Sequence, residues 1–380
     1  MTILEPRDTL DLCQIVADAG ACGTKLELRG GGTRAGIGAP RDATVVSLRS
    51  IQGVVDYDPA ELVLTVRPGT PLSDVQALVA NEGQMLAFEP WGEAGATIGG
   101  TVAAGVAGSR RVTAGSARDH LLGLTAVSGR GEMFVAGAKV VKNVTGYDLP
   151  KLMAGSWGRL GGMTELTLKV LPRPRMTITL MAQGLSPRAA HAAMSCALGS
   201  NADVSAAAHL ARGITLLRVA GFAPSVAARC LALPALLRDH CALQQLDEAD
   251  AAPLWAEAMT GAQLSGAVRW RVHLPPRHAP DLLEALAPLG IDWAMDWGGG
   301  QLWIALDDAG TIVREAAAKF GGEATLIVAD AGMRAEIPAF HPRAPGVAGL
   351  EQRVRRAFDP MGVFATGRFS EDAHADPLPA

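Results

Sequence analysis

The chain has 380 residues, a formal net charge of −4 at pH 7, 44 glycines and 49% hydrophobic residues. This length predicts two or three domains, each large enough to bury a core without disulfides. The near-balanced charge and the scattered arginines provide no clustered basic face, so we expect no nucleic-acid partner.

The cysteines show no C-x-x-C spacing or other metal-ligand pattern; they are Cys13, Cys22, Cys196, Cys230 and Cys241. We interpret them as reduced, buried thiols of a cytosolic protein. Because iron–sulfur clusters need grouped cysteine thiolates, the chain is expected to hold none of its own. No basic stretch followed by an apolar one opens the chain, and no apolar run reaches roughly 18 residues. We therefore expect neither a signal peptide nor a transmembrane segment.

Short helices and strands alternate in the first half of the chain. Helices are expected over 9–19, ended by Gly20, and over 71–81, which begins with Pro71. Alternating apolar residues predict strands over 25–29, 44–48, 61–67, 121–127, 132–135 and 161–171. The two strands at 121–127 and 132–135 are expected to form a hairpin.

Three glycine clusters lie beside these elements, within 28–36, 96–101 and 154–162. Glycine has no Cβ and tolerates positive φ, so its backbone N–H can approach a ligand closely. Successive inward N–H groups form a nest for the oxygens of a diphosphate. None of the clusters is a G-x-G-x-x-G that opens a long helix after a strand, which excludes a Rossmann site, and a Walker A pattern is also absent. The three clusters together predict an extended phosphate-bearing cofactor held at several points.

The proline-rich segment 171–175 marks a domain boundary, because it resists helix formation. Beyond it we expect strands at 176–182, 203–208, 214–220, 241–246, 267–274, 301–306 and 324–329, separated by alanine-rich helices. This pattern predicts an α+β domain over 176–335 whose antiparallel sheet is covered on one face. The βαββαβ order at 176–246 predicts a ferredoxin-like unit, followed by a degenerate repeat. A final segment, 340–380, contains an amphipathic helix at 350–358.

The order of these blocks resembles the PCMH-type FAD-binding domain of the vanillyl-alcohol-oxidase superfamily. The resemblance rests on the segments 26–38, 94–108, 115–119, 146–149 and 154–162 followed by Glu165. It implies an FAD-binding domain of two α/β subdomains over 1–172, an α+β cap domain with an antiparallel sheet, and a tail that returns to the FAD domain. Further motifs resemble the small flavin-binding subunits of bacterial glycolate oxidases, at 110–111, 117–120, 140–148, 171–174 and 357–364.

The resemblance assigns cofactor contacts to each cluster. Those expected around the FAD pyrophosphate are Arg29, Gly30, Gly31, Gly32 and Thr33, followed along the pyrophosphate and flavin by Thr97, Ile98, Gly99 and Gly100. Ser116 and Asp119 are expected near the flavin or the ribityl chain, and those closing over the cofactor are Ser156, Gly158, Leu160 and Gly161. Two alternatives stay open: Asp119 could instead form a surface ion pair with Arg118, and Tyr147 could be a core side chain.

The resemblance also bears on how FAD is attached. Many members of the superfamily link FAD covalently to a histidine near the first loop. No histidine precedes His120 in this chain, so we expect FAD to be bound non-covalently.

The sequence gives only weak indications of catalytic residues. Related D-2-hydroxy-acid dehydrogenases carry a His-x-His-x-Gly-Asp-Gly-Asn segment, which this chain lacks, and its eight histidines form no metal-ligand pattern. On the strand 268–274, alternation places Arg269, Arg271 and His273 on one face and Val268, Trp270, Val272 and Leu274 on the other. Two arginines beside a histidine could hold a carboxylate, which makes Arg271 and His273 the catalytic candidates. The alternative is a solvated outer sheet face.

Because the chain lacks both the histidine motif and a cysteine cluster, we expect it to work within a complex. The resemblance implies oxidation of glycolate to glyoxylate with a second flavin subunit, which bears the substrate site, and an iron–sulfur subunit as electron acceptor. We expect a cytoplasmic location, or attachment to the inner face of the plasma membrane through the complex. The alternatives are a stand-alone flavin-dependent dehydrogenase or oxidase of a hydroxy acid or sugar alcohol, and a structural subunit without redox activity.

Overall fold

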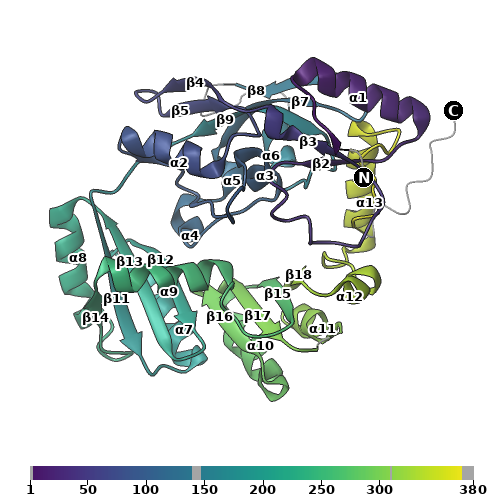
Figure 1. The fold of residues 1–380 in the computed structure, drawn as a ribbon. Helices are drawn as coiled ribbons and strands as arrows, with labels where there is room; N and C mark the ends of the chain where they lie inside the picture. Colours follow the sequence, from purple (N-terminus) through teal and green to yellow (C-terminus); the bar gives the residue numbers. More distant parts are fainter. Residues whose placement is uncertain (1–2, 139–146, 309, 370–380) are drawn as a thin grey trace. The chain divides into compact units, whose positions relative to one another are not determined.

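The computed structural model describes residues 3–138, 147–308 and 310–369 (Figure 1). The chain forms two compact units, one of Met1–Ala107, Gly115–Arg173 and Pro342–Ala380, and one of Gly108–Ala114 and Pro174–His341. Residues 108–114 fall inside the range expected for the FAD-binding domain, yet they belong to the second unit. Most of the motif at 140–148, as well as His374, lies outside the described residues.

The first unit contains two main sheets. A parallel sheet has the order β1 (Ile3–Leu4), β3 (Thr44–Ser47), β2 (Leu26–Arg29). An antiparallel sheet has the order β4 (Val54–Asp58), β5 (Val63–Val66), β9 (Gly162–Lys169), β7 (Leu121–Val127), β8 (Met133–Gly137). A short pair, β6 (Gln84–Met85) and β10 (Leu171–Pro172), stands apart from both. The two sheets with their helices agree with the predicted pair of α/β subdomains, and the β7–β8 hairpin is confirmed.

The helices of this unit correct one expected boundary. Helix α1 (Thr9–Cys22) is capped by Asp8, whose carboxylate accepts from the backbone N of Asp11 at 2.9 Å. Gly20 does not end it; the helix continues to Gly23, which has φ 70° and takes the left-handed C-cap that glycine favours. The other helices of this unit are α2 (Leu72–Asn81), α3 (Ile98–Ala103), α5 (Ala117–His120), α6 (Leu149–Met153) and α13 (Pro345–Phe358).

The second unit is built on one eight-stranded sheet that contains two ferredoxin-like repeats. The first repeat is β11 (Met176–Gln183), α7 (Pro187–Leu198), β12 (Val204–Leu210), β13 (Ile214–Gly221), α8 (Ala223–Leu236) and β14 (Gln244–Leu246). The second is β15 (Val268–His273), α10 (Ala279–Leu286), β16 (Asp292–Asp296), β17 (Gln301–Leu306), α11 (Ile312–Lys319) and β18 (Glu323–Val328). Strands β12 and β16 join them, with His209 opposite Met295. The predicted unit and its repeat are confirmed, although β16 was not foreseen.

Both faces of this sheet are covered, so the expectation of one covered face is wrong. Leu180 on β11 packs into the helix-covered core, whereas its neighbour Thr179 accepts a hydrogen bond from Nε1 of Trp255 at 3.0 Å. Trp255 belongs to α9 (Glu248–Thr260), an unforeseen helix that packs on the second face. Its ring also lies under the guanidinium of Arg218, 4.1 Å from the ring centroid. Two short helices complete the unit, α4 (Arg111–Ala114) and α12 (Ala331–Glu336).

The cysteines all lie in the described part of the chain and none of them is paired in a disulfide. The expectation that all of them are buried is wrong for Cys22, which lies exposed at the end of α1, while the other four are partly buried. Over the residues that the structure describes, no helix combines the length and apolar character needed to cross a membrane.

Candidate functional site

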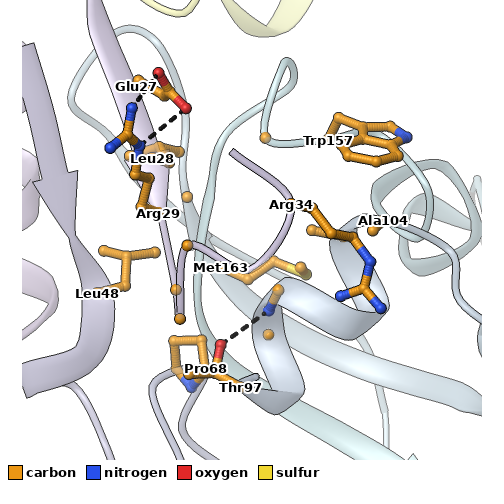
Figure 2. Close-up of a pocket in the computed structure, with 18 of the residues that line it drawn as sticks. Glu27, Leu28, Arg29, Arg34, Leu48, Pro68, Thr97, Ala104, Trp157 and Met163 are labelled. Carbon is orange, nitrogen blue, oxygen red and sulfur yellow. Dashed lines mark hydrogen bonds and ion pairs between the residues drawn. The ribbon is translucent and has the colours of Figure 1, made fainter. Parts of the chain in front are cut away.

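A pocket in the first unit brings the three glycine clusters together (Figure 2). The predicted cofactor residues that line this first-unit pocket are Arg29, Gly30, Gly31, Gly32, Thr33, Thr97, Gly99, Gly100, Gly158 and Gly161. Figure 2 shows the Glu27–Arg29 ion pair on one side and Trp157 with Arg34 on the other. Ile98, Ser116, Asp119, Ser156 and Leu160 do not line it.

The first cluster follows the carboxyl end of β2, where Arg29 is the last strand residue. Within the described chain, the backbone N–H groups of Gly31, Gly32 and Thr33 donate to no protein acceptor. Gly32 has φ 75°, and an added Cβ would meet nothing within 4 Å. These lining N–H groups are therefore available for an anionic ligand.

Other glycines are required by the close approach of two loops. A Cβ on Gly30 would collide with Oγ1 of Thr97, and a Cβ on Gly31 would collide with the carbonyl oxygen of Gly95. Gly99 likewise has no room for a side chain, because Pro68 lies against it. At these three positions, contact between protein segments is sufficient to explain the glycine.

The second cluster begins α3, and its N–H groups are used inside the protein. Thr97 caps the helix by accepting from the backbone N of Gly100 at 3.2 Å, the bond drawn in Figure 2. The backbone N of Ile98 donates to Thr70 at 3.0 Å, and that of Gly99 donates to Pro68 at 2.9 Å. This cluster thus supplies pocket surface without side chains rather than free donors, while the Ile98 side chain packs in the core.

The third cluster is attached to the last residues of α3. The backbone N of Gly155 donates to Val102 at 3.0 Å, and that of Trp157 donates to Ala103 at 2.9 Å. Trp157 lines the pocket with φ 60°, a conformation that is unusual for a non-glycine residue. Sequence reasoning named its neighbours Ser156 and Gly158 but missed Trp157.

Ser156 and Leu160 lie behind this loop rather than on the pocket surface. Leu160 packs into the hydrophobic core of the unit. The Ser156 hydroxyl is buried and has no hydrogen-bond partner among the described residues. A buried hydroxyl without a partner costs about 1–3 kcal/mol, so a ligand that satisfied Ser156 would stabilise the loop.

A buried charge cluster lies beside the pocket. Glu27 is 4% exposed; it accepts from Nε of Arg29 at 3.0 Å and from Nε of Arg41 at 2.7 Å. Burial by itself raises the pKa of Glu27, but the hydrogen bonds from Arg41 and Arg29 and the charge of Arg368 bring it down to about 2. Glu27 is thus ionised and orients Arg29, one of three arginines in the pocket wall.

The other two arginines of the wall, Arg34 and Arg368, were not predicted. Arg34 donates from Nη2 to the carbonyl of Trp91 at 3.0 Å, and its guanidinium lies 5.2 Å from the centroid of that ring. Arg368 is 8% exposed and donates from Nε to the carbonyl of Ile37 at 2.9 Å. The wall thus carries more positive than negative charge, which favours an anionic ligand.

Ser116 and Asp119 form a capping box at α5, outside the pocket. The carboxylate of Asp119 accepts from both the backbone N and the Oγ of Ser116, each at 2.8 Å. The backbone hydrogen bond from Ser116 lowers the pKa of Asp119. Their contact with a cofactor stays a prediction. Tyr147 is 89% exposed, so its interpretation as a core side chain is wrong.

The catalytic candidates lie on β15 in the second unit. Val268, Trp270 and Val272 are buried in the core, as the alternation predicted, whereas Arg269, Arg271 and His273 lie half-buried. The expected carboxylate clamp is only partly assembled: Arg269 donates to the backbone carbonyls of residues 262 and 264, at 3.4 and 3.3 Å. His273 donates from Nε2 to Oε1 of Gln301 at 3.3 Å.

The electrostatics of His273 limit what it can do. Burial, together with the charges of Arg271 and Arg111, lowers the pKa of His273 to about 3. Such an imidazole is neutral near pH 7 and is a weak base, which disfavours a role as general base. A catalytic role for Arg271 and His273 stays a prediction.

Sequence comparisons identify relatives of the chain. A family model described as FAD binding domain matches residues 2–137. Glycolate oxidase subunit GlcE of Escherichia coli K12 is 34% identical over 350 residues, which is 91% of this chain and 92% of GlcE. D-lactate dehydrogenase of Anaerostipes hadrus is 37% identical over 159 residues, 42% of this chain and 32% of the enzyme. Glycolate oxidase subunit GlcD of Bacillus subtilis is 31% identical over 182 residues, 47% of this chain and 39% of GlcD.

Structural comparison finds the same fold in solved structures of low sequence identity. p-Cresol methylhydroxylase with bound substrate matches with a TM-score of 0.76 at 13% identity, over 98% of this chain and 89% of that one. Alkyldihydroxyacetonephosphate synthase matches with a TM-score of 0.67 at 14% identity, over 94% of this chain and 74% of that one. At these identities the likeness concerns the fold alone, and it confirms the predicted fold class.

Proposed function

The chain belongs to the family of glycolate oxidase subunit GlcE, and we propose that it is the FAD-binding subunit of a complex that oxidises glycolate to glyoxylate. Its cofactor is FAD, in keeping with the family model over residues 2–137. The relatives include proteins named for glycolate, lactate and 2-hydroxyglutarate, which supports a 2-hydroxy acid as the substrate class.

The observation that carries the proposal is the set of free backbone donors in the first-unit pocket. Gly31, Gly32 and Thr33 offer N–H groups without protein acceptors, and Arg29 and Arg34 add guanidinium groups to the same wall. This donor set fits a diphosphate. Apolar lining from Leu28, Leu48, Pro68 and Met163 fits the flat ring systems of FAD.

We further propose that FAD is held non-covalently. No lining residue in the described part of the chain is a histidine, cysteine or tyrosine, the nucleophilic side chains that would bond to a flavin. The pocket therefore holds the cofactor through hydrogen bonds, charge and apolar contact alone.

The chain's own residues have a positioning role in this reaction. Bound FAD supplies the hydride acceptor for the oxidation of the hydroxy acid. The Glu27 carboxylate orients Arg29, and the loop that carries Trp157 is fixed to α3, so the pocket wall is set before the cofactor arrives. We propose that a second flavin subunit bears the substrate site, and that an iron–sulfur subunit accepts the electrons. The complex is proposed to work in the cytoplasm, either free or attached to the inner face of the plasma membrane.

Cofactor binding is tested on the purified full chain. We expect flavin absorbance bands after incubation with FAD, and release of all the flavin into the supernatant on acid precipitation. Flavin that stayed with the precipitate would exclude non-covalent binding. A spectrum without flavin bands, even after soaking with FAD, would exclude FAD binding by the isolated chain and favour a structural subunit.

The proposal that the chain works within a complex is tested by a separate measurement. Glycolate oxidation with a dye acceptor is compared between the chain alone and the assembly purified through a tag on this chain. We expect turnover in the assembly and little in the chain alone. A rate for the isolated chain close to that of the assembly would instead identify a stand-alone dehydrogenase.

A further inference from the structure

Three arginines lie in the wall of the first-unit pocket, namely Arg29, Arg34 and Arg368. Each is a cation at neutral pH and could pair with an anionic ligand. Their contacts inside the protein differ, and these contacts decide which guanidinium group still has donors to offer to a ligand.

Arg29 and Arg368 donate to acceptors of the protein itself. Arg29 donates from Nε and Nη2 to the two carboxylate oxygens of Glu27, each at 3.0 Å. These are the paired N–H groups with which a guanidinium binds an oxyanion side by side. Arg368 donates from Nε to the carbonyl of Ile37 at 2.9 Å and from Nη2 to that of Arg34 at 2.5 Å. Its Nη1 lies 3.8 Å from Oε1 of Glu27. The protein therefore already occupies the main donors of both side chains.

Arg34 is held differently. Its Nη2 donates to the carbonyl of Trp91 at 3.0 Å, and its guanidinium carbon lies 5.2 Å from the centroid of the Trp91 ring. Over residues 3–138, 147–308 and 310–369, its Nε and Nη1 donate to no acceptor, and no carboxylate forms an ion pair with it. The carbonyl and the ring thus orient the side chain, while two of its nitrogens and its charge stay available to a ligand.

The surroundings of Arg34 favour an anionic ligand. The residue is half-buried, and burial lowers its pKa, an effect that the charge of Glu93 offsets only in part. A guanidinium remains protonated at neutral pH even so. A half-buried cation without a counter-ion is costly, so the chain gains stability when a ligand supplies the anion. Figure 2 shows Arg34 on the side of Trp157, away from the Glu27–Arg29 ion pair, so Glu27 does not supply it.

Arg34 also continues the loop that carries the free backbone donors. The N–H groups of Gly31, Gly32 and Thr33 come immediately before it in the chain. Its own backbone carbonyl accepts from the backbone N of Ile37 at 3.2 Å, which closes the loop directly behind it. A guanidinium and a row of backbone donors on one fixed loop match the charge and the oxygens of a diphosphate.

From this arrangement we infer that Arg34 is the cation that binds the diphosphate of FAD, and that its charge makes the first-unit pocket select ligands that carry a diphosphate. Arg29 and Arg368 act as positioning residues of the same wall. That the diphosphate belongs to FAD rests on the proposed function; the binding of a diphosphate at Arg34 does not.

The test titrates sodium pyrophosphate, and separately FAD, into the full chain freed of flavin. We expect saturable binding of both, measured by heat for pyrophosphate and by quenching of flavin fluorescence for FAD. Arg34→Gln is expected to weaken both roughly tenfold or more, the loss typical of one hydrogen bond to a charged group. Arg130→Gln is the matched control, because Arg130 is exposed in the same unit. Equal pyrophosphate affinity in the wild type and Arg34→Gln would overturn the inference, as would absence of pyrophosphate binding or the same loss in Arg130→Gln.

Two further measurements separate the charge of Arg34 from its shape. Arg34→Lys keeps the charge without the planar fork, so it is expected to retain part of the pyrophosphate affinity that Arg34→Gln loses. FAD affinity is expected to fall more steeply with added salt in the wild type than in Arg34→Gln, because salt screens the charge. Equal losses in the two variants, or an equal salt dependence, would overturn the role of the charge.

Urea unfolding without ligand shows whether the substitution acts through the fold. Arg34→Gln removes a charge that has no carboxylate partner among the described residues, so its unfolding midpoint is expected to match that of the wild type. Arg29→Gln takes a pair of donors from buried Glu27 and is expected to lower the midpoint. A midpoint for Arg34→Gln as low as that of Arg29→Gln would overturn the inference, since it would assign Arg34 a structural role.

Pyrophosphate binding and FAD uptake are separate readouts, which distinguishes this inference from the proposed function. Pyrophosphate binding that depends on Arg34, in a chain that takes up no FAD, would support the diphosphate site while the proposed function fails. FAD uptake with equal affinity in the wild type and Arg34→Gln would overturn the inference and leave the proposed function intact.

Discussion

A hydrogen bond of 2.9 Å joins the guanidinium Nε of Arg368 to the backbone carbonyl of Ile37, a residue 331 positions earlier in the sequence. The same guanidinium donates from Nη2 to the carbonyl of Arg34 at 2.5 Å, and its Nη1 lies 3.8 Å from Oε1 of Glu27. A segment near the C-terminal end therefore completes the wall of the first-unit pocket and holds the loop after β2.

Replacement of Arg368 tests this role. Arg368→Ala leaves two carbonyls without their donor and removes one charge near buried Glu27, so we expect a loss of about 3 kcal/mol in unfolding free energy. FAD affinity is expected to fall with it, because the loop that we propose to bind FAD loses its support. Urea unfolding and FAD titration measure the two effects. Arg238→Ala, at an exposed position, serves as control; equal results for both variants would contradict a role for Arg368.

The ionisation of Glu27 makes the free energy of unfolding depend on pH. Its folded pKa of about 2 lies below the value of about 4.3 in an unfolded chain, so its ionised form stabilises the fold at higher pH. This contribution, about 3 kcal/mol, is present above roughly pH 4.3 and is lost as the pH falls toward 2. Unfolding free energy measured between pH 6 and pH 3 is therefore expected to fall less steeply in Glu27→Gln than in the wild type.

The same substitution has a cost at neutral pH. Glu27→Gln leaves Arg29 and Arg41 without their counter-charge, which is expected to destabilise the chain by about 3–5 kcal/mol. Glu61→Gln, at an exposed position, should change neither the stability nor its pH dependence. An unchanged pH slope in Glu27→Gln would show that this carboxylate is not the group responsible.

The sequence predicted only part of the pocket, because the glycines of the three clusters are required for different reasons. Glycine marks places where backbone comes close to something, and the clusters did identify three walls of the pocket. What comes close differs among them: Gly31 faces the carbonyl of Gly95, whereas Gly32 faces open space. Arg368 could not be found, because nothing near it in the sequence indicates a partner more than 300 residues away.

The fold was more predictable where the pattern is local. Alternation on β15 correctly placed Trp270 in the core, because strand periodicity follows from the backbone alone. The end of α1 was misplaced, since Gly20 and Gly23 are equally permissive and the choice between them depends on packing. Gly20 lies against Val363 from the distant C-terminal segment, a contact that local sequence cannot reveal.

Gly31 and Gly32 are a matched pair of positions for a test, because Gly31 packs against another loop whereas Gly32 faces open space. In Gly31→Ala the new methyl collides with the carbonyl of Gly95, so we expect the unfolding free energy without FAD to drop by about 1–3 kcal/mol. In Gly32→Ala the space is open and only the left-handed backbone is strained, at about 1 kcal/mol. If FAD binds to the N–H groups of this loop, Gly32→Ala should lose at least as much free energy of FAD binding as it loses free energy of unfolding.

Both variants are compared by urea unfolding without FAD and by FAD titration of the folded protein. A Gly32→Ala chain that bound FAD as tightly as the wild type would argue against a diphosphate at this loop. A Gly31→Ala chain as stable as the wild type would mean that the contact with the carbonyl of Gly95 is not a constraint.

Asp296 anchors the segment 108–114 within the second unit, through its acceptance from Oγ of Ser109 and the backbone N of Trp297, both at 2.7 Å. Asp296→Ala leaves both donors unsatisfied and is expected to cost about 3 kcal/mol. Asp296→Asn keeps one oxygen for Trp297, and its amide can donate to the Ser109 hydroxyl, so its cost should be nearer 1 kcal/mol. Thermal unfolding gives the order of the two variants, with Asp239→Ala, 86% exposed at its side chain, as control. Equal losses in the two variants would mean that the negative charge of Asp296, which both substitutions remove, holds the segment in place rather than its acceptor geometry.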